Sequence, residues 1–362
     1  MPVLPRRLAA PLCVALVLPL VAGCRSNLGA RTVEPAGQHY SIALSRAWAG
    51  PMLLNLVRLR YRDTLQFLTV NNVVTQYNYG ASGTAALTFD FDGSTDGVAG
   101  GGLEYSESPT ITYTPLGGEA FVRRMLTPLS PEGLMLLSNA GWSIERLMMC
   151  CVSSVNGLEN ALNAAGPTPD YPPIFGDFKR LAWLLRQLQK AGLFRTSIVG
   201  EDVYAHLYES DESPYREQIA EVRQLLSLTG DTRRMHVDNE YRPDEPGEIA
   251  LVGRSLLAAL FDLSRGLKTT AQHAQAGLVT ITPSEDGTPL DWWEAMSGIL
   301  RIHSSRERPA NAFVSLPYRG YWFYIEDSDL HSKATWALLT YMFSMQASSG
   351  PGGGPLLTLS AN

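Results

Sequence analysis

The N-terminal segment constrains the fold most, because it decides which residues reach the folded body. Arg6-Arg7 gives a short positive start, and an apolar run follows from Leu8 to Val21. Ala22-Gly23 then supplies two small residues at the end of the run. This order is typical of a secretory signal peptide, and the run is too short to span a bilayer comfortably. We therefore expect residues 1–23 to be removed and the remaining chain to fold in the cell envelope.

The end of the apolar run also indicates a lipid anchor. Val21-Ala22-Gly23-Cys24 resembles the lipobox of bacterial lipoproteins, in which the cysteine receives diacylglycerol before cleavage. The resemblance implies that Cys24 becomes the acylated first residue, with fatty acids such as palmitate holding the protein on membrane lipid. The alternative is an ordinary secretory signal followed by a chance cysteine. Arg25 occupies the sorting position, where a residue other than aspartate implies the outer membrane in Gram-negative bacteria.

Length and charge exclude some classes of protein. Removal of residues 1–23 from the 362-residue chain leaves enough sequence for one large or two medium domains. The formal charge of −6 becomes more negative still, because the removed segment carries only two arginines. This acidity argues against a dedicated nucleic-acid binder, which needs a basic face. No later apolar run reaches the length of a membrane-spanning helix, so the lipid is expected to be the anchor.

The first half of the mature chain predicts a helix, a hairpin and then more helices. Ser41 to Arg62 has helical spacing, with Pro51 as a possible kink. Strands are expected over Leu65–Tyr79 and Thr84–Phe91, joined by a turn at Gly80–Gly83, because both are rich in β-branched and aromatic residues. Thr110–Thr114 alternates as a further strand. Helical sequence then extends from Gly118 to Ala161, interrupted by Pro128, Pro131 and Gly141.

The second half begins after the proline-rich break at residues 166–173, the best candidate boundary in the chain. Amphipathic helices are predicted from Asp177 and from Ser213-Pro214, with a short hairpin around Gly200 between them. Helices and strands are mixed rather than strictly alternating. This order favours an α+β fold, with mostly antiparallel strands in one compact body behind the lipid tether. The remaining expected elements are a helix in the second half of Ile249–Leu263, strands over 299–303, 312–316 and 321–325, and a final helix over 328–346.

These elements suggest a division of the chain into five parts. We expect a signal peptide at 1–23, a lipidated tether at 24–38, an N-terminal α+β part at 39–165, a C-terminal α+β part at 174–347 and a glycine-rich tail at 348–362.

Two cysteines remain for the folded body. Cys150 and Cys151 are neighbours in apolar, helical sequence. Adjacent residues on a helix point about 100° apart, so a disulfide between them would be strained. The sequence favours two small buried thiols over a redox or metal pair.

Motifs that would indicate a reaction, metal or cofactor are weak. Asp90–Gly97 has alternating carboxylates that Ca²⁺ could use, but the distal glutamate of an EF-hand loop is missing and a solvated hairpin tip fits better. Gly100–Gly102 is expected to be a flexible connector. The six histidines show no metal-binding spacing, and no nucleophile motif is present. Arg254-Ser255, at a predicted helix start, could bind an anion or form a cap with a solvated arginine.

The densest cluster of functional residue types lies near the C-terminus. Tyr318 to Asp329 contains four successive aromatic residues on a predicted strand, so aromatic residues occupy both faces. Arg319 could pair with Glu326 or Asp327, or stack on a ring. One interpretation is a groove for a sugar or peptide; the favoured one is a central strand buried on both sides, which ends in an Asp or Ser helix cap. The candidate binding residues are Arg319, Tyr321, Trp322, Tyr324, Asp327 and Asp329.

Three stretches resemble a group of uncharacterised bacterial lipoproteins: Leu56–Asp63, Ser108–Leu116 and Tyr318–Ile325. The resemblance implies the lipoprotein character and no activity. We therefore expect a lipid-anchored envelope protein, with a non-enzymatic role in binding or scaffolding an envelope protein or surface polymer. The alternative is a lipid-anchored hydrolase or carbohydrate-binding protein that uses the aromatic region from Arg319 to Asp329.

The lipid anchor can be tested at Cys24. Cys24→Ala removes the thiol that would be acylated, so the folded body should leave the membrane fraction and appear in the soluble fraction, or the precursor should accumulate unprocessed. Fractionation with mass analysis of the N-terminus measures both effects. A mature-sized Cys24→Ala protein that still sediments with membranes would contradict the anchor.

Overall fold

The computed structural model describes residues 48–89, 95–161, 174–208, 214–228, 232–239, 247–347 and 357–360. Helices and mostly antiparallel strands are mixed along the chain, which confirms the α+β class. Apart from residue 48, the described residues belong to one unit, Ala49–Asn362. The predicted signal peptide, Cys24 and the break at 166–173 lie outside the described residues. Among the helices that are described, none is long and apolar enough to cross a membrane.

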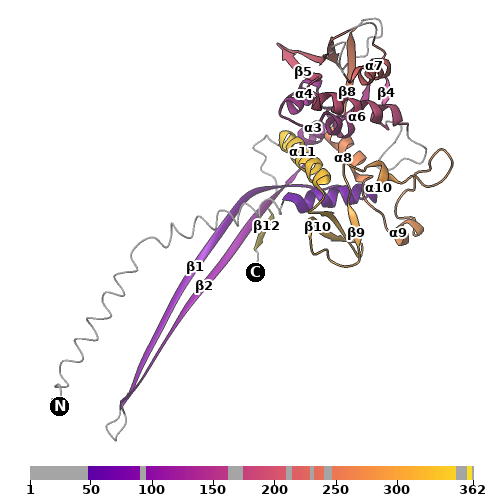
Figure 1. Cartoon of the computed structure of the whole chain (residues 1–362). Helices are drawn as coiled ribbons and strands as arrows, with labels where there is room; N and C mark the ends of the chain where they lie inside the picture. The colour runs from indigo at the N-terminus through magenta and orange to yellow at the C-terminus, as the bar shows by residue number, and fades with distance from the viewer. Residues whose placement is uncertain are drawn as a thin grey trace. The chain divides into compact units, whose positions relative to one another are not determined.

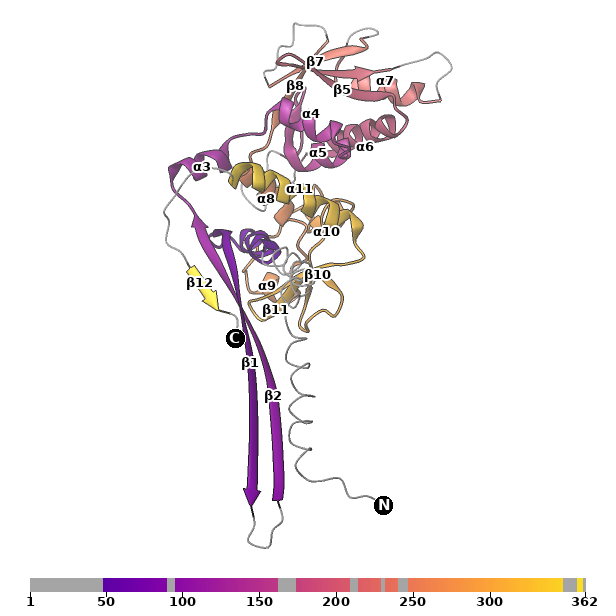
Figure 2. The same ribbon diagram turned by 90° about the vertical axis from the view of Figure 1, so that its left-hand side faces the viewer.

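A six-stranded sheet takes strands from both halves of the chain, in the order β4-β3-β8-β7-β6-β5. Its neighbouring strands are antiparallel except for the parallel pair β7 and β8. The predicted hairpin around Gly200 is confirmed as β5 and β6. Figure 2 shows helices α4, α5 and α6 on one side of this sheet. The strands are β3 (Val152–Val155), β4 (Leu158–Glu159), β5 (Phe194–Val199), β6 (Asp202–Leu207), β7 (Arg234–Asp238) and β8 (Glu248–Gly253).

Helices α6 (Gly176–Lys190) and α7 (Arg216–Leu225) confirm the amphipathic pattern of the sequence. On α6 the predicted apolar face is buried, including Phe178 and Leu181. Ile219 and Val222 of α7 are fully buried. Such a buried apolar stripe contributes most of the stability of a helix in a globular protein.

The helical stretch predicted over Gly118–Ala161 is correct only in its first three quarters. It divides into α3 (Glu119–Leu126), α4 (Pro131–Asn139) and α5 (Ile144–Cys151) near the predicted proline and glycine breaks. After Cys151 the chain becomes strand β3, because Val152 adopts an extended conformation and the strand pairs with β8. Helical spacing alone did not reveal this long-range pairing.

The two cysteines of α5 are buried free thiols, as predicted. Cys150 and Cys151 have no exposed surface. Burial raises the pKa of Cys150 to about 12 and that of Cys151 well above its ordinary value. Neither thiol is therefore a thiolate at neutral pH, and both act as small apolar side chains.

A buried ion pair joins the end of α5 to helix α8 (Leu256–Ser264). The guanidinium of Arg254 is 2.7 Å from the Asp262 carboxylate and donates to the carbonyl of Met149 at 2.9 Å and to that of Asn160. The Asn160 amide donates in turn to the carbonyl of Val152 at 2.8 Å. The expectation of an anion site or solvated arginine at Arg254-Ser255 is wrong for Arg254, because it is buried against its own carboxylate; Ser255 is the helix N-cap, as the capping alternative expected.

A second, smaller sheet has the order β10-β11-β9. Its strands are β9 (His303–Ser305), β10 (Ala312–Tyr318) and β11 (Tyr321–Glu326). β10 and β11 join at the predicted turn, where Arg319 and Gly320 have φ values of 47° and 80°. The helix over residues 48–60 approaches this sheet through Tyr61, whose ring lies 6.1 Å from that of Phe323. Helix α11 (Leu330–Ala347) follows β11 and confirms the predicted final helix.

The predicted hairpin turn at Gly80–Gly83 is wrong. Strand β1 runs without interruption over Phe67–Phe89 and pairs antiparallel with β2 (Thr95–Leu116), as Figure 1 shows. The glycines lie within the ladder, with Gly83 opposite Gly101, so Gly100–Gly102 is strand and not the connector that we expected. β12 (Leu357–Ser360) pairs with β2 near its end. Of the Asp90–Gly97 loop, residues 90–94 lie outside the described residues.

Candidate functional site

The predicted aromatic strand is central in the small sheet, but it is buried on one face only. Phe323 and Ile325 have no exposed surface. Trp322 and Tyr324, on the opposite face, are partly exposed. The favoured interpretation of a strand buried on both sides is therefore wrong for the face that carries Trp322.

Arg319 pairs with a residue that the sequence did not suggest. Its guanidinium lies 2.9 Å from the carboxylate of Asp63, not beside Glu326 or Asp327, and the Tyr318 hydroxyl donates to the same carboxylate. Burial raises the pKa of Asp63, but the hydrogen bonds from Tyr318 and Arg319 outweigh this effect and hold the pKa below its ordinary value. These contacts attach the β10–β11 turn to the end of the first helix.

The exposed aromatic residues are also engaged by the chain itself. The Tyr321 hydroxyl donates to the Gln272 side chain at 3.0 Å. Tyr324 stacks on His303, with ring centroids 5.2 Å apart. The guanidinium of Arg308 lies 5.4 Å from the centre of the Trp322 ring.

The acidic end of the candidate region starts helix α11. Asp329 accepts hydrogen bonds from the Ser332 amide and hydroxyl at 3.0 and 2.6 Å, which confirms the predicted cap. Asp327 forms an ion pair with Lys333 at 2.7 Å. The structure thus brings the candidate residues near one another on β11 and its flanks, but each serves a contact within the fold.

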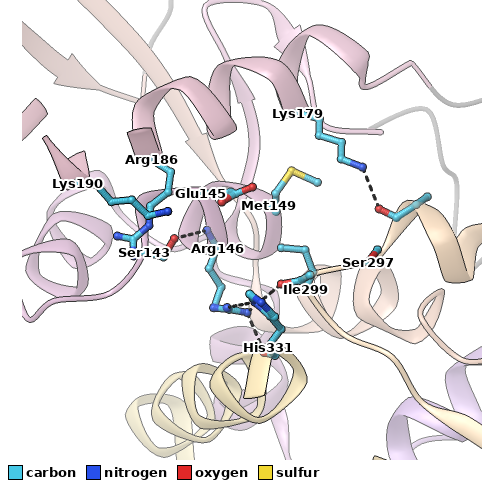
Figure 3. A pocket seen from close by; sticks show the side chains of 12 residues that line it. Ser143, Glu145, Arg146, Met149, Lys179, Arg186, Lys190, Ser297, Ile299 and His331 are labelled. Atoms are coloured by element: carbon cyan, nitrogen blue, oxygen red, sulfur yellow. Dashed lines mark hydrogen bonds between the residues drawn. The ribbon is translucent and has the colours of Figure 1, made fainter. Parts of the chain in front are cut away.

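A cavity elsewhere in the fold is lined by several charged side chains. It has a volume of about 210 Å³ and lies between α5, α6, the start of α11 and residues 295–299 (Figure 3). Four basic side chains line it, together with His331, and Glu145 is the only acidic residue of the lining. The basic residues are Arg146, Lys179, Arg186 and Lys190.

Arg146 is the buried member of this group. Its guanidinium donates to the carbonyl of His331 at 2.9 Å and to the hydroxyl of Thr335 at 2.6 Å. These acceptors are neutral, so they satisfy the N–H groups without cancelling the charge. Burial lowers the pKa of Arg146, which is the sign of a cation that its surroundings solvate poorly. An anion in the cavity would offset the free-energy cost of burying this charge.

The other cations of the cavity come from one face of α6. Lys179, Arg186 and Lys190 follow one another at intervals of seven and four residues, so they lie on the same side of the helix. Arg186 donates to Gln189 at 2.6 Å and Lys179 reaches the carbonyl of Ala295 at 3.5 Å. Figure 3 shows the Lys190 and Arg186 side chains at one end of the cavity and Lys179 at the other.

The sequence alone did not predict this cavity. The spacing of Lys179, Arg186 and Lys190 was a readable signal, but basic residues on an amphipathic helix usually form a solvated face. Arg146 could not be linked to them, because α5 and α6 meet only in the folded chain. Within the described ranges, no group of three or more His, Cys, Asp or Glu residues is placed to hold a metal ion.

Comparison with known proteins adds no assignment: no family model, curated protein or solved structure matches this chain.

The two faces of β11 predict different mutational costs. Phe323→Ala removes a fully buried ring and should lower the free energy of unfolding by about 3–5 kcal/mol. Trp322→Ala removes a partly exposed ring and should cost clearly less, although its side chain is larger. Urea unfolding of both variants measures the difference. Equal losses would show that Trp322 belongs to the core.

Proposed function

We propose that this protein is a lipid-anchored component of the cell envelope, tethered through Cys24 and routed to the outer membrane, that acts by binding rather than by catalysis. Its ligand site is the basic cavity between α5, α6 and α11, and its ligand is an anionic group of an envelope polymer or protein. The observation that carries this proposal is the buried guanidinium of Arg146, whose hydrogen bonds to His331 and Thr335 go to neutral acceptors, beside three further cations.

The charge of the cavity is opposite to that of the chain. The protein has a formal charge of −6, yet this cavity is lined by four basic residues and one acidic residue. Like charges at close range repel one another, so such a cluster destabilises the ligand-free protein. A bound anion would reduce this repulsion. A cationic cluster in an acidic protein is therefore better explained by a ligand than by overall composition.

The dimensions favour a small group rather than an extended ligand. A cavity of about 210 Å³ is smaller than typical pockets for drug-sized molecules, which begin near 300 Å³. Phosphate and carboxylate groups match this cluster of cations, because lysine and arginine side chains bind both groups through charge-assisted hydrogen bonds. Phosphate or carboxylate groups of a surface polymer, or acidic side chains of a partner, carry this chemistry.

A hydrolase or carbohydrate-binding role for the aromatic region has less support. Its polar groups are occupied within the fold, as the Arg319 pair with Asp63 and the Asp329 cap of α11 illustrate. We therefore place ligand binding at the basic cavity.

Inorganic phosphate is the simplest probe of the cavity. Isothermal titration of the purified full-length protein at low ionic strength should detect phosphate binding that weakens as salt is added. Lys190→Gln removes one cation at the rim and should weaken binding about tenfold, the effect of one lost charge-assisted hydrogen bond. Lys190 is exposed on α6, so the folded protein should be retained.

Arg216→Gln on α7 is the matched control, since Arg216 is an exposed helical cation outside the cavity. It should leave phosphate binding unchanged. If the two variants lose affinity equally, the effect is one of net charge and the assigned site is wrong. Absence of saturable binding by the unaltered protein would remove the proposal.

A further inference from the structure

The β1–β2 hairpin is much longer than strands of globular proteins, which usually have about 3–10 residues. β1 has 23 residues and β2 has 22, and their register pairs Phe67 with Leu116 at one end and Phe89 with Thr95 at the other. At about 3.3 Å per residue, each strand extends for about 70 Å. A two-stranded ribbon of this length has too few neighbours to be stable by itself in water.

The register separates the residues of the hairpin into an apolar and a polar face. Alternate residues of a strand lie on opposite faces, and directly paired residues share a face. Beyond the irregularity at Val70/Asn72, one face carries mostly apolar residues and the other mostly polar ones. The apolar face pairs Val73 with Ile111, Tyr79 with Tyr105, Ala81 with Leu103, Gly83 with Gly101, Ala85 with Ala99 and Leu87 with Gly97. The polar face pairs Asn72 with Thr112, Gln76 with Ser108, Asn78 with Ser106, Gly80 with Glu104, Ser82 with Gly102, Thr84 with Gly100 and Thr88 with Asp96. Its apolar members are Val74, which pairs with Thr110, and the pair of Ala86 with Val98.

Aromatic residues mark two levels of the apolar face. The paired Tyr79 and Tyr105 form one level, and Phe89 forms the other. The ten residue steps from Tyr79 to Phe89 measure about 33 Å along the strand, and about 25 Å along the membrane normal at a tilt of about 40°. This matches the apolar band of transmembrane strands, which is about 25 Å tall with aromatic residues at both borders.

The positions of the charged residues are consistent with a membrane span between the two aromatic levels. Between the two aromatic levels, the charged residues Asp96 and Glu104 both lie on the polar face. Glu107 lies on the apolar face, but it pairs with Tyr77, outside the interval. A charged side chain that faces lipid costs several kcal/mol at the membrane centre. The apolar face carries no charged residue between the two aromatic levels, which favours lipid over water as the surroundings of this face.

The edges of the hairpin need partners as well. Among the described strands, β1 pairs only with β2, and β12 covers β2 only from Thr110 to Tyr113. In the interval from Tyr79 to Phe89 and from Thr95 to Tyr105, no strand of the described part of the chain therefore lies beside the outer edges. Hydrocarbon offers no hydrogen-bond partner for backbone N–H and C=O groups, so a spanning sheet has to close on itself.

We propose that hairpins from several copies of this chain join edge to edge into a closed sheet that crosses a lipid bilayer. Residues 79–89 and 95–105 form the span, the apolar face contacts lipid and the polar face lines the interior. Each copy supplies two strands, and the narrowest closed transmembrane sheets have about eight strands, so at least four copies are required. The proposal rests neither on the basic cavity nor on the acylation of Cys24.

Neighbouring residues on the two faces provide a matched test. Ala85→Cys lies on the apolar face and Thr84→Cys on the polar face, at the middle of the span. The variants also carry Cys13→Ser and Cys24→Ser, and the remaining Cys150 and Cys151 are fully buried, so an environment-sensitive thiol dye should label the new cysteine. The full-length variants are reconstituted in phosphatidylcholine vesicles, with Glu201→Cys in the exposed β5–β6 turn as the aqueous control. A quencher attached to the lipid chains should quench the Ala85→Cys label several-fold more than the Thr84→Cys or Glu201→Cys label.

The labels also distinguish the other occupants of the apolar face. Equal quenching of the two hairpin labels by the lipid-bound quencher would overturn the proposal. An Ala85→Cys label shielded from both lipid-bound and aqueous quenchers would also overturn it, because the face would then contact protein. Crosslinking in the vesicles should give species of four or more copies, and a ladder that stops at two copies would contradict the closed sheet.

Discussion

The buried guanidinium of Arg254 is the interaction on which the helical body depends. It binds the Asp262 carboxylate of α8 and the Met149 carbonyl near the end of α5, while its backbone N–H donates to Cys151. Helix ends leave carbonyls without internal partners, and Arg254 and Asn160 supply donors for those of α5. Loss of one partner from such a buried pair generally costs about 3–5 kcal/mol, because a charge remains without compensation.

This arrangement has a direct consequence for the basic cavity. Arg146 lies on α5 one turn before Cys150, so the rotation of α5 decides whether its guanidinium reaches His331 and Thr335 of α11. The two arginines are both buried but differ in what they meet. Arg254 pairs with the carboxylate of Asp262, which also pairs with the buried Arg265 at 2.8 Å, whereas Arg146 donates to the neutral carbonyl of His331 and hydroxyl of Thr335. We propose that the charge of Arg146 serves a ligand.

Local features of the fold could be predicted from the sequence, and long-range ones could not. The buried face of α6, the β5–β6 hairpin and the Asp329 cap depend on residues close in the chain, where side-chain periodicity and capping determine the outcome. The pair between Arg319 and Asp63 joins residues 256 positions apart, and the basic cavity needs α5, α6 and α11 together. Gly80 and Gly83 predict a turn because glycine usually interrupts strands, whereas in the structure Gly83 pairs with Gly101 in the ladder.

The helical body and the β1–β2 hairpin cover their apolar residues in different ways. In the body, helices and sheets cover one another, so residues such as Phe178 and Phe323 lie in a closed core. In the hairpin, two strands alone cannot cover an apolar face, and lipid together with neighbouring copies completes it. Hydrogen exchange tests this division most directly. With the full-length protein in vesicles, the backbone amides of 79–89 and 95–105 should exchange far more slowly than in lipid-free solution, while α6 exchanges alike in both. Equally fast exchange of these strands with and without vesicles would contradict the account.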